Sequence, residues 1–168
     1  GYLHKPVDPD KLFEIIKKWE PHSLTGQPQS NKKIYSAADM RSAIANHELI
    51  NYYQPKVSVA TGEVIGVETL VRWHHPTDGV ILPDRFIGVA EENNLINDLT
   101  RFVLIDALTQ TKIWHQSGLM LRVAINVSMD NLASLDFQDL VVNLVTEAGL
   151  SPKNIVLEVT ESQLMGAD

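Results

Sequence analysis

In the second half of the chain, apolar patterns typical of helices and of strands alternate, and this alternation restricts the fold more than any other feature. A long apolar helix is predicted over about 97–115, followed by a strand over 121–127. A second helical stripe over 137–148 ends at Gly149, and a strand follows over 155–160. Strands separated by helices pair in parallel as βα units. The sequence therefore predicts an α/β protein with a parallel sheet.

The first half of this region has a different pattern. Two strands are predicted over 50–59 and 64–73, and the turn at 60–63 joins them as a hairpin. A serine and an aspartate spaced as a capping box predict a short helix over about 37–47. Pro83 is expected to open a further helix after a loop. The parallel sheet should therefore begin with an antiparallel pair.

The first 35 residues are predicted to lie outside the main domain. Residues 1–20 have the pattern of a strand end followed by a helix with one apolar stripe, and no partner for that stripe lies within them. Residues 21–35 contain Pro, Ser, Gly, Gln, Asn and Lys without a period, which is typical of a linker. The main domain is expected to span 36–168.

Composition excludes several classes of protein. The 168 residues include 44% hydrophobic and 21% charged residues, which fits a globular domain. The net charge of −7 and the lack of a basic stripe argue against a nucleic-acid polymer as partner. The absence of cysteine excludes disulfides and thiolate metal sites and agrees with a cytoplasmic location. No stretch resembles a membrane span or a signal peptide.

Three strands carry an oxygen ligand near their C-terminal ends. Side chains alternate across a strand, so in each case one face is apolar and the other carries the polar residue: Glu68, Asn126 or Glu158. Arg72 shares the face of Glu68. Two carboxylates and an amide oxygen that converge form a hard-oxygen site suited to Mg²⁺ or Mn²⁺.

Purely structural roles would also explain why these polar residues occur on the strands. Glu68 and Arg72 could form an ion pair, Asn126 could favour a turn, and Glu158 could be a partner for a lysine. On alternation alone the two interpretations are about equally good. A zinc site at the adjacent pair His74 and His75 is disfavoured, because neighbouring side chains on a strand point to opposite faces.

Several ordered motifs resemble the EAL domain of cyclic-di-GMP phosphodiesterases, and the resemblance covers roughly residues 36–168. The motifs that carry it are Tyr53-Gln54-Pro55, Glu68-Thr69-Leu70-Val71-Arg72-Trp73, His75-Pro76, Pro83-x-x-Phe86-Ile87, Ala90-Glu91-Glu92, Asn126-Val127-Ser128 and Glu158-Val159-Thr160-Glu161.

The resemblance implies a TIM-like (β/α)₈ barrel that hydrolyses cyclic di-GMP to linear pGpG with two divalent cations, Mg²⁺ or Mn²⁺. It implies that Glu68, Asn126 and Glu158 are metal ligands, and that Glu68 is thereby catalytic. It further implies that Arg72 contacts a substrate phosphate and that Gln54 lies in the substrate pocket. Glu161 would steady a catalytic loop.

The family's paired aspartates, its lysine and its later glutamate and glutamine would follow Asp168. The barrel is therefore expected to be incomplete here, and the 168 residues alone are expected to be inactive. The signature contains Thr69 where the family has alanine; alternation places Thr69 on the face opposite Glu68. A degenerate domain that binds cyclic di-GMP without cleaving it, or a protein-interaction module, is the alternative.

The segment Tyr2-Leu3-His4-Lys5-Pro6 resembles the last strand and loop of a flavodoxin-like receiver domain of a response regulator. The resemblance implies that Lys5 senses an acyl phosphate and that Tyr2 is a switch aromatic. Residues 9–19 would be the last receiver helix. An upstream histidine kinase is then the expected partner, and a homo-oligomer is compatible with the sequence.

Overall fold

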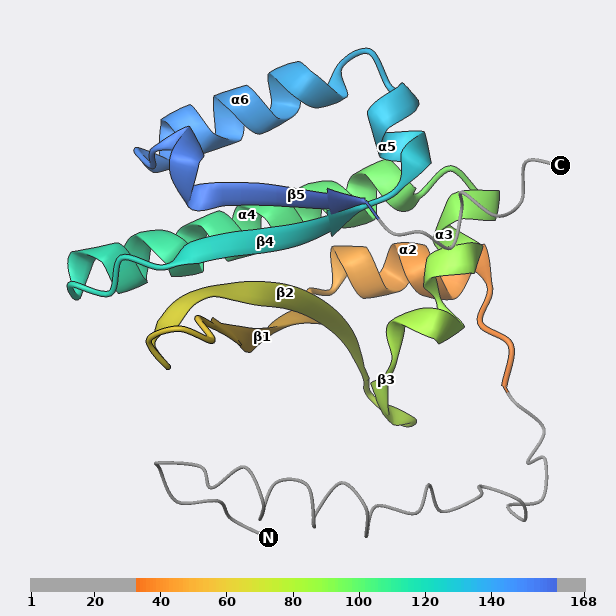
Figure 1. Cartoon of the computed structure of the whole chain (residues 1–168). Coiled ribbons are helices and arrows are strands. Elements are labelled where there is room, and N and C mark those ends of the chain that lie inside the picture. The colour runs from red at the N-terminus through yellow and green to blue at the C-terminus, as the bar shows by residue number, and fades with distance from the viewer. Residues whose placement is uncertain (1–32, 160–168) are drawn as a thin grey trace, which may run out of the picture. The chain divides into compact units, whose positions relative to one another are not determined.

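The computed structural model describes residues 33–159 (Figure 1). Within this range, residues 34–159 belong to one compact unit. The predicted receiver segment over 1–20 and nearly all of the predicted linker lie outside the described residues.

The core of the fold is a mixed five-stranded sheet with the order β1-β2-β4-β5, in which β3 pairs with the far end of β2. β1 and β2 are antiparallel, whereas β2 with β4 and β4 with β5 are parallel. The prediction of a hairpin that leads into a parallel sheet is therefore confirmed. The strands are β1 (Leu49–Val57), β2 (Val64–His75), β3 (Gly79–Ile81), β4 (Arg122–Val127) and β5 (Ile155–Val159).

Helices connect the strands. The long helix and the stripe that ends at Gly149 lie within one residue of their predicted bounds, and Gly149 has a left-handed φ of 70°. The helices are α2 (Ala37–Ala45), α3 (Ile87–Glu92), α4 (Ile96–Gln116), α5 (Met129–Ala133) and α6 (Phe137–Ala148), with short 3₁₀ turns η1 (Pro83–Arg85) and η2 (Pro152–Asn154). The sequence patterns did not predict β3 or α5, and the single helix expected at Pro83 is divided between η1 and α3.

Two hydrophobic clusters join the helices to the sheet. The first lies at α2 and α3 around Trp73, which is 1% exposed and whose Nε1 donates a hydrogen bond to Oε2 of Glu48 at 2.8 Å. The second joins β4 to α4 and α6 and includes Leu104, Val123 and Ile125. Figure 1 shows α4 alongside β4 and α6 near β5. Because alternate residues of β4 face these helices, the residues between them face the other side of the sheet.

Gly66 allows a close approach of β2 and β4. A Cβ atom at this position would lie 2.7 Å from the carbonyl oxygen of Arg122, which is closer than side chains are found. The position therefore requires glycine.

No helix in the described range 33–159 is long and apolar enough to cross a membrane.

Candidate functional site

The structure brings the three predicted oxygen ligands together on one face of the sheet. Glu68 lies on β2, Asn126 on β4 and Glu158 on β5, and Asn126 is directly opposite Glu158 in the parallel β4–β5 pair. Nδ2 of Asn126 donates a hydrogen bond to Oε1 of Glu68 at 3.0 Å. Asn126 thus lies beside both carboxylates, as the alternation of side chains predicted.

Each carboxylate has a different partner. Glu68 accepts its hydrogen bond from a neutral amide, whereas Oε1 of Glu158 forms an ion pair with Nζ of Lys56 on β1. The structural alternative for Glu158, a lysine partner, is therefore present as a contact. An ion pair between Glu68 and Arg72 is not found in the part of the chain that the structure describes.

The predicted substrate-binding residues share this face. Gln54 is exposed and lies directly opposite Glu68 in the β1–β2 pair. Arg72 is half-buried; its Nη1 donates to the carbonyl oxygen of Val71 at 2.9 Å, and its Cζ lies 5.8 Å from the ring centroid of Tyr52. Arg72 is thus held against an aromatic ring along the strand that carries Glu68.

The donor set fits a hard divalent cation. Carboxylate and amide oxygens are ligands for Mg²⁺ and Mn²⁺. Within residues 33–159, no three side chains of His, Cys, Asp or Glu lie close enough to hold a metal ion, so a site here depends on two carboxylates and an amide. Glu161, Lys5 and Tyr2 lie outside the described residues, and their roles remain predictions.

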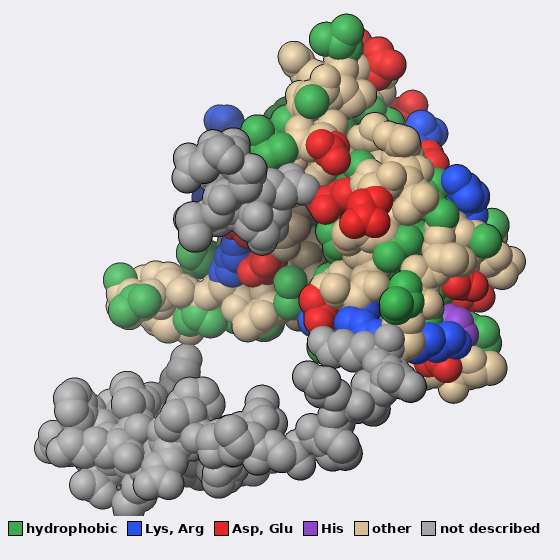
Figure 2. All heavy atoms as spheres, turned by 90° about the vertical axis from the view of Figure 1, so that its right-hand side faces the viewer, with side chains coloured by type: hydrophobic (Ala, Val, Ile, Leu, Met, Phe, Trp, Pro, Cys, Tyr) green, Lys and Arg blue, Asp and Glu red, His purple; other side chains and the backbone are tan. Residues whose placement is uncertain are grey.

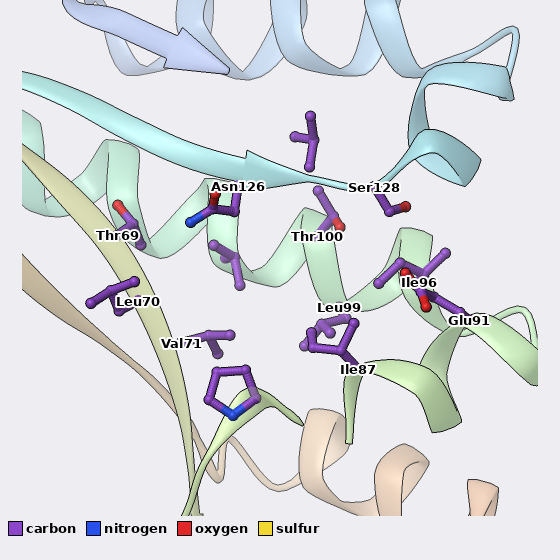
Figure 3. Close-up of a pocket in the computed structure, with 13 residues that line it drawn as sticks. Thr69, Leu70, Val71, Ile87, Glu91, Ile96, Leu99, Thr100, Asn126 and Ser128 are labelled. Carbon is purple, nitrogen blue, oxygen red and sulfur yellow. The ribbon is translucent and has the colours of Figure 1, made fainter. Parts of the chain in front are cut away.

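Thr69 lies on the face of β2 opposite Glu68 and lines a cavity of about 230 Å³ between the sheet and α4 (Figure 3). Its side chain is 3% exposed, and among the described residues its hydroxyl has no hydrogen-bond partner. Figure 3 shows Asn126 and Thr100 at the same cavity, among apolar side chains. The prediction that Thr69 packs toward the helices is confirmed.

A buried polar network fixes the loop that follows Asn126. Asn131 is 0% exposed; its Oδ1 accepts hydrogen bonds from Thr100 Oγ1 at 3.0 Å and from the backbone N–H of Ser128 at 2.9 Å. Its Nδ2 donates to Oδ1 of Asn97 at 2.7 Å. Sequence reasoning missed Asn131, although its spacing of three residues from Ser128 is that of a capping box.

The two adjacent histidines have separate partners. Nε2 of His74 lies 3.1 Å from the hydroxyl of Tyr52, and Nδ1 of His75 lies 3.5 Å from a carboxylate oxygen of Asp78. This divergence agrees with the expectation that they do not share a zinc ion.

β1 is anchored to α4 on the side opposite the site. The hydroxyl of Tyr53 donates to Oδ2 of Asp106 at 3.5 Å, and Nδ2 of Asn51 donates to the carbonyl oxygen of Val103 at 3.0 Å. Burial and the neighbouring Asp106 charge raise the pKa of Tyr53 well above its usual value. Tyr53 therefore stays a neutral hydrogen-bond donor at physiological pH.

Acidic side chains gather on one face of the molecule. Figure 2 shows them near the middle of the face that lies on the right of Figure 1, where α3 and α5 are, with Lys and Arg mostly toward its edges. A small anionic ligand would therefore need local positive charge, from arginine or from bound cations.

The EAL domain family model matches residues 37–168. A signaling protein of Caulobacter vibrioides, itself uncharacterized, is 46% identical over 128 residues, which is 76% of this chain and 16% of that protein. The cyclic di-GMP phosphodiesterase NbdA of Pseudomonas aeruginosa is 39% identical over 138 residues, which is 82% of this chain and 18% of NbdA. The chain thus spans less than a fifth of the length of these relatives.

A solved structure of a phosphodiesterase has a similar fold. The PaMucR phosphodiesterase, in complex with c-di-GMP, superposes with a TM-score of 0.73 at 37% identity, over 77% of this chain and 53% of that one. The chain belongs to the EAL domain family.

Proposed function

We propose that the full-length protein containing this chain is a phosphodiesterase that hydrolyses cyclic di-GMP to linear pGpG. The proposal includes Glu68, Asn126 and Glu158 as ligands of Mg²⁺ or Mn²⁺, with the site completed by residues beyond Asp168. It also includes completion of the (β/α)₈ barrel by that later sequence. The names of NbdA and of the MucR complex support cyclic di-GMP as the substrate.

One observation carries the proposal. Asn126 is hydrogen-bonded to Glu68 and is directly opposite Glu158, so three neighbouring strands direct oxygen atoms to one face. Two carboxylates on one face repel each other, and a divalent cation would relieve that repulsion. A module that only binds other proteins would not require two carboxylates and an amide to converge on one face of the sheet.

The chain's own residues would position the substrate. Glu68 and Glu158 would hold the cations, and Asn126 would keep Glu68 oriented through its amide hydrogen bond. Arg72 would contact a phosphate with its planar guanidinium, and Gln54 would lie beside the bound nucleotide. Two divalent cations in such a site supply an activated water nucleophile and stabilise the phosphoryl oxygens.

Hydrolysis by the full-length protein tests the proposal. With Mg²⁺ or Mn²⁺ present, we expect pGpG to appear in chromatographic analysis of a reaction with cyclic di-GMP, and we expect EDTA to abolish it. Binding without product would instead support the receptor alternative. A protein that neither binds nor hydrolyses cyclic di-GMP would contradict both the enzyme and the receptor, and the interaction module would be the remaining interpretation.

Arg72→Ala is expected to weaken binding of cyclic di-GMP by about tenfold or more, because a charge-assisted phosphate contact is lost. Arg72→Lys should recover only part of the affinity, since an ammonium cannot reproduce the bidentate fork. Calorimetric titration of the full-length variants measures both values. An affinity unchanged in Arg72→Ala would contradict the phosphate-contact role.

We also propose that a receiver domain precedes the EAL domain, that a histidine kinase phosphorylates it, and that the protein acts in the cytoplasm. The support is the segment Tyr2–Pro6 alone, with Lys5 and Tyr2 as switch residues. Phosphorylation of the full-length protein by acetyl phosphate, detected on a Phos-tag gel, tests this. A full-length protein that takes up no phosphate would contradict it.

A further inference from the structure

Lys56 reaches across the sheet to the candidate metal site. It lies on β1, two residues after Gln54, and its Nζ forms an ion pair with Oε1 of Glu158 on β5. The strands β2 and β4 lie between β1 and β5. The ion pair therefore spans the two strands between Lys56 and a proposed metal ligand that is 102 residues away in sequence.

Small residues make this crossing possible. Lys56 is directly opposite Gly66 in the β1–β2 pair, and on β4 Gly66 is paired with Arg122, which is followed on the same face by Ala124. Together with Glu158 they line a shallow cavity of about 180 Å³. Since Gly66 cannot carry a side chain without displacing the Arg122 carbonyl, the space under the lysine is built into the strand spacing.

The two acids of the site differ in how their charge is balanced. Glu68 accepts a hydrogen bond from the neutral amide of Asn126, whereas Glu158 has a full positive charge beside it. Among the described residues, Lys56 is the only cation paired with Glu158. A divalent cation bound to Glu158 would lie near the Lys56 ammonium. Two positive charges beside one carboxylate repel each other, most strongly where water is partly excluded. The two cations therefore compete for one carboxylate.

We propose that Lys56 is the resident cation of this site: it holds Glu158 in place when no divalent cation is bound and must leave when one binds. Lys56 thereby sets the concentration at which Mg²⁺ or Mn²⁺ fills the site. The inference rests on the proposed function, which assigns Glu158 as a metal ligand.

Calorimetric titration of the full-length protein with Mn²⁺ alone, without nucleotide, measures this competition. We expect Lys56→Met to bind Mn²⁺ about tenfold more tightly than the wild type, because the competing charge is gone. Lys56→Arg, which keeps the charge, should stay within about threefold of the wild type. Lys112→Met removes the same charge at an exposed position of α4, which packs on the other face of the sheet, and should leave the affinity unchanged.

Thermal unfolding provides a second measurement. It distinguishes a lysine that competes with the divalent cation from one that only stabilises the fold. In EDTA, Lys56→Met should unfold at a lower temperature than the wild type, because Glu158 has lost its partner. Saturating Mn²⁺ should close this gap, since the cation restores the balance of charge and binds the folded state more tightly. A gap that persists at saturating Mn²⁺ would overturn the inference.

The failures of the two proposals are distinguishable. If Glu158→Gln abolishes Mn²⁺ binding but Lys56→Met binds as the wild type does, the metal site stands and the role of Lys56 is overturned. If Glu158→Gln leaves Mn²⁺ binding intact, both are overturned. Lys56→Gln gives the same comparison if Lys56→Met does not fold.

Discussion

Glu68→Gln in the full-length protein is expected to lower the turnover of cyclic di-GMP by about a thousandfold or more, because a ligand charge at a divalent-cation site contributes several kcal/mol to the transition state. Glutamine keeps the size of the side chain, and its carbonyl oxygen can still accept the hydrogen bond from Asn126 that Glu68 accepts at 3.0 Å. The fold should therefore survive the change. Release of pGpG in the presence of Mg²⁺ or Mn²⁺ is the measurement.

Glu63→Gln is the matched control. Glu63 is exposed in the turn between β1 and β2, so the same change of charge occurs there without touching the site. Wild-type turnover is expected in this variant. Wild-type turnover in Glu68→Gln as well would refute the assignment of Glu68 as a metal ligand, and equal loss in both variants would point to net charge instead.

Asn131→Leu is expected to destabilise the domain by about 3–5 kcal/mol, since leucine has a similar size but no polar atoms. The substitution leaves the buried Thr100 hydroxyl and the buried backbone N–H of Ser128 without their partner, and it also removes the hydrogen bond to the exposed Asn97. Each buried polar group left unpaired costs about 1–3 kcal/mol. Urea denaturation of the full-length protein, followed by tryptophan fluorescence, measures the change.

Asp130→Leu serves as the control for this substitution. Asp130 is the neighbouring residue of α5 and is exposed, so its replacement should change the free energy of unfolding by less than about 1 kcal/mol. A loss below about 1 kcal/mol in Asn131→Leu would mean that the network adds little to stability. In that case Asn131 would not be what fixes the loop after Asn126.

The site could be predicted where it depends on alternation along single strands. The faces of β2, β4 and β5 follow from the sequence, because each carries apolar residues at every second position. Glu68, Asn126 and Glu158 were expected on the other face for that reason, and the β4–β5 register places Asn126 directly opposite Glu158. Thr69 was placed on the helix side by the same argument, and it is buried there.

Contacts that depend on the pairing of distant strands could not be predicted. Lys56 and Glu158 are far apart in sequence, and their contact requires the strand order and the absence of a side chain at Gly66. β3 has three residues, too few for a period to be recognised, and α5 has five. Asn131 looked like an ordinary polar residue because its burial comes from α4, not from its own helix.

The close contact of β2 with β4 also determines how the floor of the site could be redesigned. Any side chain at position 66 collides with the Arg122 backbone, so β2 offers no place for a new group under Lys56. Ala124 lines the same cavity and already has a Cβ atom. A library that aims to fill this floor, or to separate Lys56 from Glu158 with a larger aliphatic side chain, should therefore vary residue 124 and keep glycine at residue 66.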